Sequence, residues 1–206
     1  MDSEGRVYDP RLPLAEDSKH VVRLGPQGGT VVQQIHGPHF LGAYNEHAFH
    51  AANLGAAGQT TTVALATTYT GLVLSNPVGS GVLLAVNDVG AAFNVVFPAA
   101  AFVGVFVGYH ASTDVVHTTP LIAHSDKIGT GGVGKAKVDS VATLPIAPHV
   151  AHVFGSALAS AAGDFEHEFE GGFLLPSGAF MGLYTSTVSG TNAMLAGLDW
   201  EEIRLT

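Results

Sequence analysis

The sequence predicts an all-β protein, a sandwich or barrel of antiparallel strands. From residue 47 onward, short segments rich in Val, Thr, Phe and Ala recur at intervals of about eight to twelve residues. Turn sequences such as Asn-Pro and Gly-Ser-Gly separate these segments. Helical signal is slight, because the helix formers of Ser156 to Ala162 span only about two turns.

The composition excludes several kinds of protein and several kinds of site. The length of 206 residues suits one domain with an appendage, and 47% hydrophobic against 12% charged residues excludes a disordered charged tail. The chain has no cysteine, so disulfides, thiolate metal sites and cysteine nucleophiles are excluded. A formal net charge of -9 argues against nucleic-acid binding through phosphate neutralisation.

The charge is unevenly distributed along the chain. Between His47 and Thr113 the only formal charge is Asp88. Such a stretch lacks the charge of an ordinary solvated surface, and obligate interfaces resemble a protein core. We therefore expect other subunits to cover it, with the interface formed by Val95, Phe97, Phe102, Val105, Phe106, Tyr109 and Trp200.

A membrane span is the weaker explanation of this stretch. The longest apolar run, Val95 to Tyr109, is about 15 residues, and a spanning helix needs roughly 20. Pro98, Gly104 and Gly108 interrupt it. The first residues are polar and acidic, so we also expect no signal peptide.

Residues 1–46 are expected to form an extended arm with short strands, and residues 47–206 the β-domain. Prolines and glycines near the start discourage regular structure, although Val21 to Leu24 and Thr30 to Ile35 suit paired strands. An arm of this kind wraps a neighbouring subunit, and a frayed terminus is the alternative.

Strands of the β-domain follow in order. They are expected at Thr60 to Thr70, Gly71 to Ser75, Val82 to Val86, Phe93 to Tyr109 (one strand bent at Pro98, or two strands), Val138 to Leu144, Val150 to Phe154, Phe165 to Leu175, Ala179 to Thr187 and Leu195 to Leu205. Asn87-Asp88 with Gly90 predicts a corner, and Pro176-Ser177-Gly178 predicts a hairpin turn.

Histidines are the first candidates for chemistry. They fall three residues apart in three places: His36 and His39, His47 and His50, and His149 and His152. Strand residues three apart point to opposite faces, so we expect no metal site built within one chain. Three copies of one histidine on a threefold axis remain an open alternative.

Two further segments are better explained by structure than by chemistry. Asp164, Glu166, Glu168 and Glu170 alternate with other residues, which favours a solvated strand face over a calcium site. The glycines of residues 129–134 precede Lys135 and Ala136, where a phosphate loop would have Lys followed by Ser or Thr. We expect no catalytic residue and no cofactor.

Two motifs carry a resemblance. The segment GLVLSNPVGSGVLLAVNDVG and the pattern GGFLLPSGAFMGLYTST followed by LAGLDWEEI are similar to segments of structural proteins of tailed bacteriophages. The matching positions are Leu72 to Val86, Leu174 to Gly178 and Leu198 to Ile203. The resemblance implies a jelly-roll subunit of a virion, of the kind compared with tumour-necrosis-factor-like trimers.

The expected function follows from this resemblance and the charge distribution. It is a non-enzymatic homotrimer that decorates or cements the capsid surface, made in the host cytoplasm and bound to the major capsid protein or a tail component. The alternative is a tail-associated component or a receptor- or glycan-binding head on the same fold. The binding residues of such a receptor- or glycan-binding head would be Tyr109, His110, His117 and the loop from His124 to Lys137.

Overall fold

The computed structural model describes residues 45–53, 65–129, 133–159, 163–187 and 194–205. These residues form strands and connecting segments, without a helix among them. The predicted all-β sandwich is confirmed. The two strands predicted within the N-terminal arm lie outside the described residues.

The described residues form eleven strands. They are β1 (Ala48–Asn53), β2 (Thr68–Ser75), β3 (Val82–Phe93), β4 (Ala101–Tyr109), β5 (Val116–Leu121), β6 (His124–Ser125), β7 (Lys137–Thr143), β8 (His149–Ala157), β9 (Asp164–Leu175), β10 (Ala179–Thr185) and β11 (Met194–Arg204). No helix in this part of the chain is long and apolar enough to cross a membrane.

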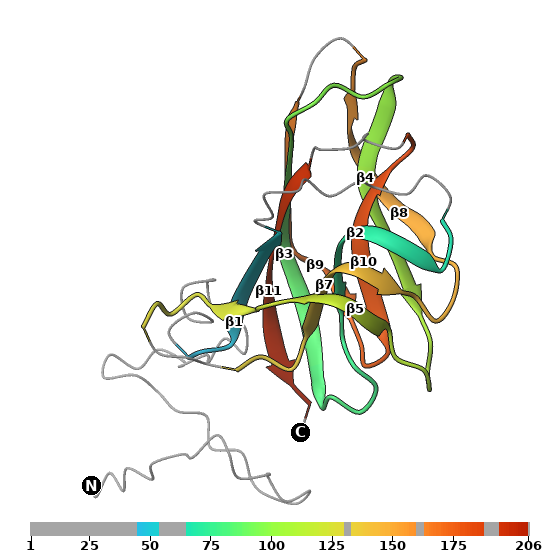
Figure 1. Cartoon of the computed structure of the whole chain (residues 1–206). Coiled ribbons are helices and arrows are strands. Elements are labelled where there is room, and N and C mark those ends of the chain that lie inside the picture. Colours follow the sequence, from blue (N-terminus) through green and yellow to red (C-terminus); the bar gives the residue numbers. More distant parts are fainter. Residues whose placement is uncertain (1–44, 54–64, 130–132, 160–162, 188–193, 206) are drawn as a thin grey trace, which may run out of the picture. The chain divides into compact units, whose positions relative to one another are not determined.

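The strands form two antiparallel sheets that face each other (Figure 1). One sheet has the order β6-β1-β11-β3-β9, and the other has the order β5-β7-β2-β10-β4-β8. Alternating side chains from both sheets fill the space between them, including Trp200, Leu84 and Leu72. This inter-sheet core follows from the period-two pattern of the sequence.

A second apolar cluster, which we call the outer cluster, includes Tyr69, Val73, Phe106 and Phe180 of the six-stranded sheet. Two of its rings occupy the space above glycines on neighbouring strands. A Cβ atom on Gly182 would lie 2.4 Å from the Phe106 ring, and one on Gly108 would lie 2.2 Å from the Phe180 ring. The missing side chains therefore let the rings pack flat on the sheet.

Two tight corners carry the chain from one sheet to the other. Residues 76–81 connect β2 to β3, and residues 176–178 connect β9 to β10, which belong to different sheets. The predicted hairpin at Pro176-Ser177-Gly178 is therefore wrong: the turn is tight, but the strands that it joins do not pair. Gly79, Gly81 and Gly178 have φ of 75°, 74° and 87°, which only glycine adopts readily.

Asn76 ties the two corners together. Its side-chain amide donates hydrogen bonds of 2.9 Å to the carbonyls of Val82 and Leu175. The backbone carbonyl of Asn76 accepts a hydrogen bond of 2.7 Å from Gly178 N–H. The two sequence motifs that carry the resemblance thus meet at one end of the sandwich.

Three local predictions need correction. The predicted corner at Asn87-Asp88 lies inside β3, where a bulge accommodates it between Val86 and Asp88. Of the two possibilities for Phe93 to Tyr109, one bent strand is wrong, because β3 ends at Phe93 and β4 starts only at Ala101. Strand β5 is absent from the prediction because its side chains are mostly exposed and it contains Pro120.

Candidate functional site

The seven predicted interface residues divide into two groups. Val95, Phe102 and Tyr109 are 42%, 60% and 54% exposed. The other four, Phe97, Val105, Phe106 and Trp200, are buried in the apolar clusters of the chain itself. The apolar character of these four side chains is therefore explained within one chain, by their packing in its own clusters.

Phe102 belongs to an exposed apolar edge, which we define as Phe102, Val153 and Leu158. Phe102 on β4 pairs with Ser156 on β8, and Val153 pairs with Gly104. Val153 and Leu158 are 46% and 59% exposed. Among the described strands β8 ends the order of its sheet. The sandwich therefore has an edge strand bordered by uncovered apolar side chains, the feature that native sheets usually guard with charge.

His50 lies in a cluster of three metal-ligating side chains, with Asp126 and Asp199. One ligand atom from each residue lies within 4.8 Å of the other two. His50 Nδ1 is 2.6 Å from Asp126 Oδ1, and the two side chains are 39% and 16% exposed. His50 on β1 pairs with Asp199 on β11 and with His124 on β6, whose ring centroid is 5.8 Å from that of His50.

Sequence spacing missed this cluster because its members are far apart along the chain. His50 and Asp126 are separated by 76 residues, and only the strand register brings them together. The available signal was weak: His50 is a polar residue in the otherwise mostly apolar strand β1, whereas Asp199 lies among other charged residues of β11 and Asp126 follows β6. The histidine pairs predicted from the sequence are not part of this cluster as pairs. The ring centroid of His152 lies 4.6 Å from that of His167, and His36 and His39 lie outside the described residues.

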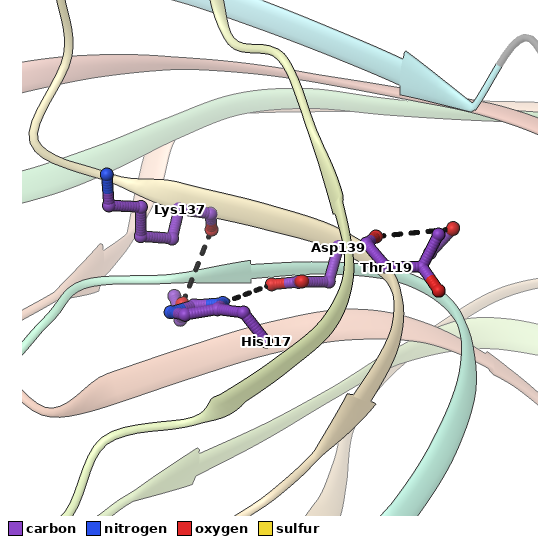
Figure 2. A network of polar contacts seen from close by, with 6 residues as sticks. His117, Thr119, Lys137 and Asp139 are labelled. Atoms are coloured by element: carbon purple, nitrogen blue, oxygen red, sulfur yellow. Dashed lines mark hydrogen bonds and ion pairs between the residues drawn. The ribbon is translucent and has the colours of Figure 1, made fainter.

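A second histidine contacts a buried carboxylate (Figure 2). The ring of His117 on β5 points to Asp139 on β7, and Nδ1 lies 2.5 Å from Oδ2. The Asp139 side chain is fully buried, and its Oδ1 has no hydrogen-bond partner. The hydroxyl of Ser75 donates to the carbonyl of Lys137 over 3.3 Å. Among the described residues, the side-chain partner of His117 is this carboxylate and not a hydroxyl.

The residues directly before β7, Gly134 to Ala136, surround a carboxylate that the chain itself supplies. The carboxylate of Glu202 on β11 accepts hydrogen bonds of 2.7 and 2.9 Å from Lys135 N–H and one of 2.8 Å from Ala136 N–H. A Cβ on Gly134 would lie 2.8 Å from the same carboxylate. Gly134 therefore has a structural role, because a side chain there would collide with the Glu202 carboxylate. This role accounts for the glycine without a bound phosphate.

The acidic run of β9 faces outward, as the sequence predicts. Asp164, Glu166 and Glu168 are exposed, and the residues between them are less exposed. Glu168 continues a row of titratable residues that crosses the whole five-stranded sheet. In cross-strand order the row is His124, His50, Asp199, Asp88 and Glu168.

No protein-family model, curated protein or solved structure matches this chain. The resemblance to phage structural proteins therefore rests on the two sequence motifs alone.

Proposed function

We propose that this chain is a non-enzymatic virion protein, a homotrimeric jelly-roll subunit that decorates or cements the capsid surface of a tailed phage. Its partners are two further copies of itself and the major capsid protein or a tail component. The proposal combines the two sequence motifs with the antiparallel sandwich in which they meet.

The exposed apolar edge of Phe102, Val153 and Leu158 is the observation that carries the proposal. Contiguous exposed apolar surface on a soluble protein marks an interaction site. An edge strand in addition offers unpaired backbone groups to a neighbour. Covering this edge with another copy removes both features from water.

The non-enzymatic part of the proposal rests on the roles that the polar groups already have. Glu202 binds two backbone amides, and Asp139 is held by His117. These contacts stabilise loops and strands within one chain. They leave neither carboxylate directed at an open cleft where a substrate would react.

Light scattering of the purified chain tests the assembly. We expect a mass of three chains, and Val153→Ser should shift the equilibrium toward monomers, because it places a hydroxyl in the buried interface. Val133→Ser is the matched control, since Val133 is 91% exposed and lies outside the edge. A wild-type monomer at micromolar concentration would overturn the proposed homotrimer.

A receptor- or glycan-binding head is the second candidate function. Ile122 and Ile128, which flank the start of the predicted binding loop, are 74% and 86% exposed. Apolar side chains projecting from a loop suit contact with a ligand surface. Binding to host cells rather than to capsids, weakened by Ile128→Ser, would favour this candidate.

A further inference from the structure

We propose that His50, Asp126 and Asp199 bind one divalent transition-metal ion per chain, with Zn²⁺ as the representative ion. This site is independent of the proposed function, because it lies within one chain and on the five-stranded sheet.

The donor set selects the class of ion. One imidazole nitrogen and two carboxylate oxygens form a mixed set, which suits Zn²⁺ and its first-row neighbours. Ca²⁺ and Mg²⁺ prefer oxygen ligands throughout, and thiolate-binding ions lack a cysteine here. The three ligand atoms lie within 4.8 Å of one another. Bond lengths of about 2.0–2.2 Å then require only a small inward movement of the side chains.

The backbone already holds two of the ligands in place. His50 and Asp199 are direct cross-strand partners on β1 and β11. Asp126 follows β6, and its backbone N–H donates a 3.1 Å hydrogen bond to the carbonyl of Ala48. The 2.6 Å contact between Asp126 Oδ1 and His50 Nδ1 directs this ring nitrogen to the carboxylate. A metal ion would replace the shared proton between these two atoms.

The surroundings favour a cation. Asp88 is the cross-strand neighbour of Asp199 on the other side, and Glu168 follows on β9. These carboxylates place acidic groups beside the three ligands, an arrangement that suits a cation better than an anion. The His124 ring stacks beside His50 without belonging to the group of ligand atoms, so water would complete the coordination.

A bound ion would join three separate segments of the chain. Strand β6 contains only two residues and pairs with β1 through His124 and Ser125. A metal ion that binds the folded chain alone raises the free energy of unfolding by mass action. We therefore expect Zn²⁺ to raise the melting temperature and to order the segment after β6 most strongly.

Calorimetric titration of the EDTA-treated chain with Zn²⁺ tests the site. We expect one ion per chain, and affinity lower by about 100-fold or more in Asp199→Asn and in His50→Asn, which remove a direct ligand. Asp164→Asn and His149→Asn are the matched controls, since both residues are exposed and lie outside the cluster. The controls should bind Zn²⁺ as the wild type does.

Two spectroscopic measurements on the wild type test the same ligands without any variant that could fail to fold. In the wild type, the ¹⁵N resonance of His50 Nδ1 should shift on addition of Zn²⁺, and Co²⁺ should give the visible absorption of a nitrogen- and oxygen-ligated ion. Absence of stoichiometric binding, or an unchanged His50 resonance, would overturn the proposal. One ion per three chains would also overturn it, and would indicate histidines on a threefold axis.

Discussion

Tyr69 shows how a single polar group is accommodated in the outer cluster. Its side chain is buried, and its hydroxyl donates a 2.6 Å hydrogen bond to the carbonyl of Leu183. Burial raises the pKa of Tyr69 well above its ordinary value, and the hydrogen bond to the Leu183 backbone opposes this only in part. The phenolate is therefore incompatible with the folded chain.

This raised pKa makes stability depend on pH in the alkaline range. The folded chain holds the Tyr69 proton more tightly than the unfolded chain, so the contribution is complete below pH 10 and is lost as the pH rises above it. The free energy of unfolding should fall by about 1.4 kcal/mol per pH unit there. Urea titrations of the wild type and of Tyr69→Phe measure how the free energy of unfolding changes with pH in each protein. They should run between pH 9 and pH 11, about one unit either side of the ordinary pKa. Equal slopes in the two proteins would contradict the prediction.

At the same scale, sequence predicts what depends on neighbours along the strand. The outward direction of Glu166 and Glu168 follows from a period of two, which is local. The contact of His50 with Asp126 depends on which strands pair and in which register, and no local pattern contains that information. The contact between His117 and Asp139 could not be predicted for the same reason.

Among the elements, strands were easier to predict than their connections. The Asn-Pro and Pro-Ser-Gly sequences predict tight turns, and the structure has both. Whether a tight turn leads to a paired strand or to the other sheet depends on tertiary packing. Here Asn76 holds the two corners together through Val82 and Leu175, so both turns cross between the sheets.

The packing of rings over glycines gives a prediction at this scale. Gly182→Ala should destabilise the chain by about 1–3 kcal/mol, since the added Cβ would overlap the buried Phe106 ring at 2.4 Å. Gly197→Ala on β11 is the matched control, because its nearest neighbour would be 3.8 Å away. Chemical denaturation of both variants measures the difference, and equal stabilities would show that the outer cluster repacks without cost.

For the whole molecule, the two outer faces differ in chemistry. The five-stranded sheet presents a row of two histidines and three carboxylates. The six-stranded sheet carries the outer cluster and, beside it, the exposed apolar edge. The low charge of residues 47–113 is explained in part without a partner, because much of this stretch fills two apolar clusters of the same chain. The proposed partner concerns only the apolar side chains that stay exposed. Sequence alone could not separate these, since both require apolar residues.

Removal of residues 1–46 separates assembly from docking. All three residues of the apolar edge lie in β4, in β8 or directly after β8, so residues 47–206 should still form trimers. If the predicted N-terminal arm contacts the capsid rather than a neighbouring subunit, the shortened chain should lose binding to purified capsids. Light scattering and co-sedimentation with capsids measure the two properties on the same sample. A monomeric product would transfer the trimer contacts to the arm, and unchanged capsid binding would assign docking to the β-domain.

Because the ion pair of Lys127 with Glu46 is partly exposed, its loss should cost at most about 1 kcal/mol, and the melting temperature serves as the folding control.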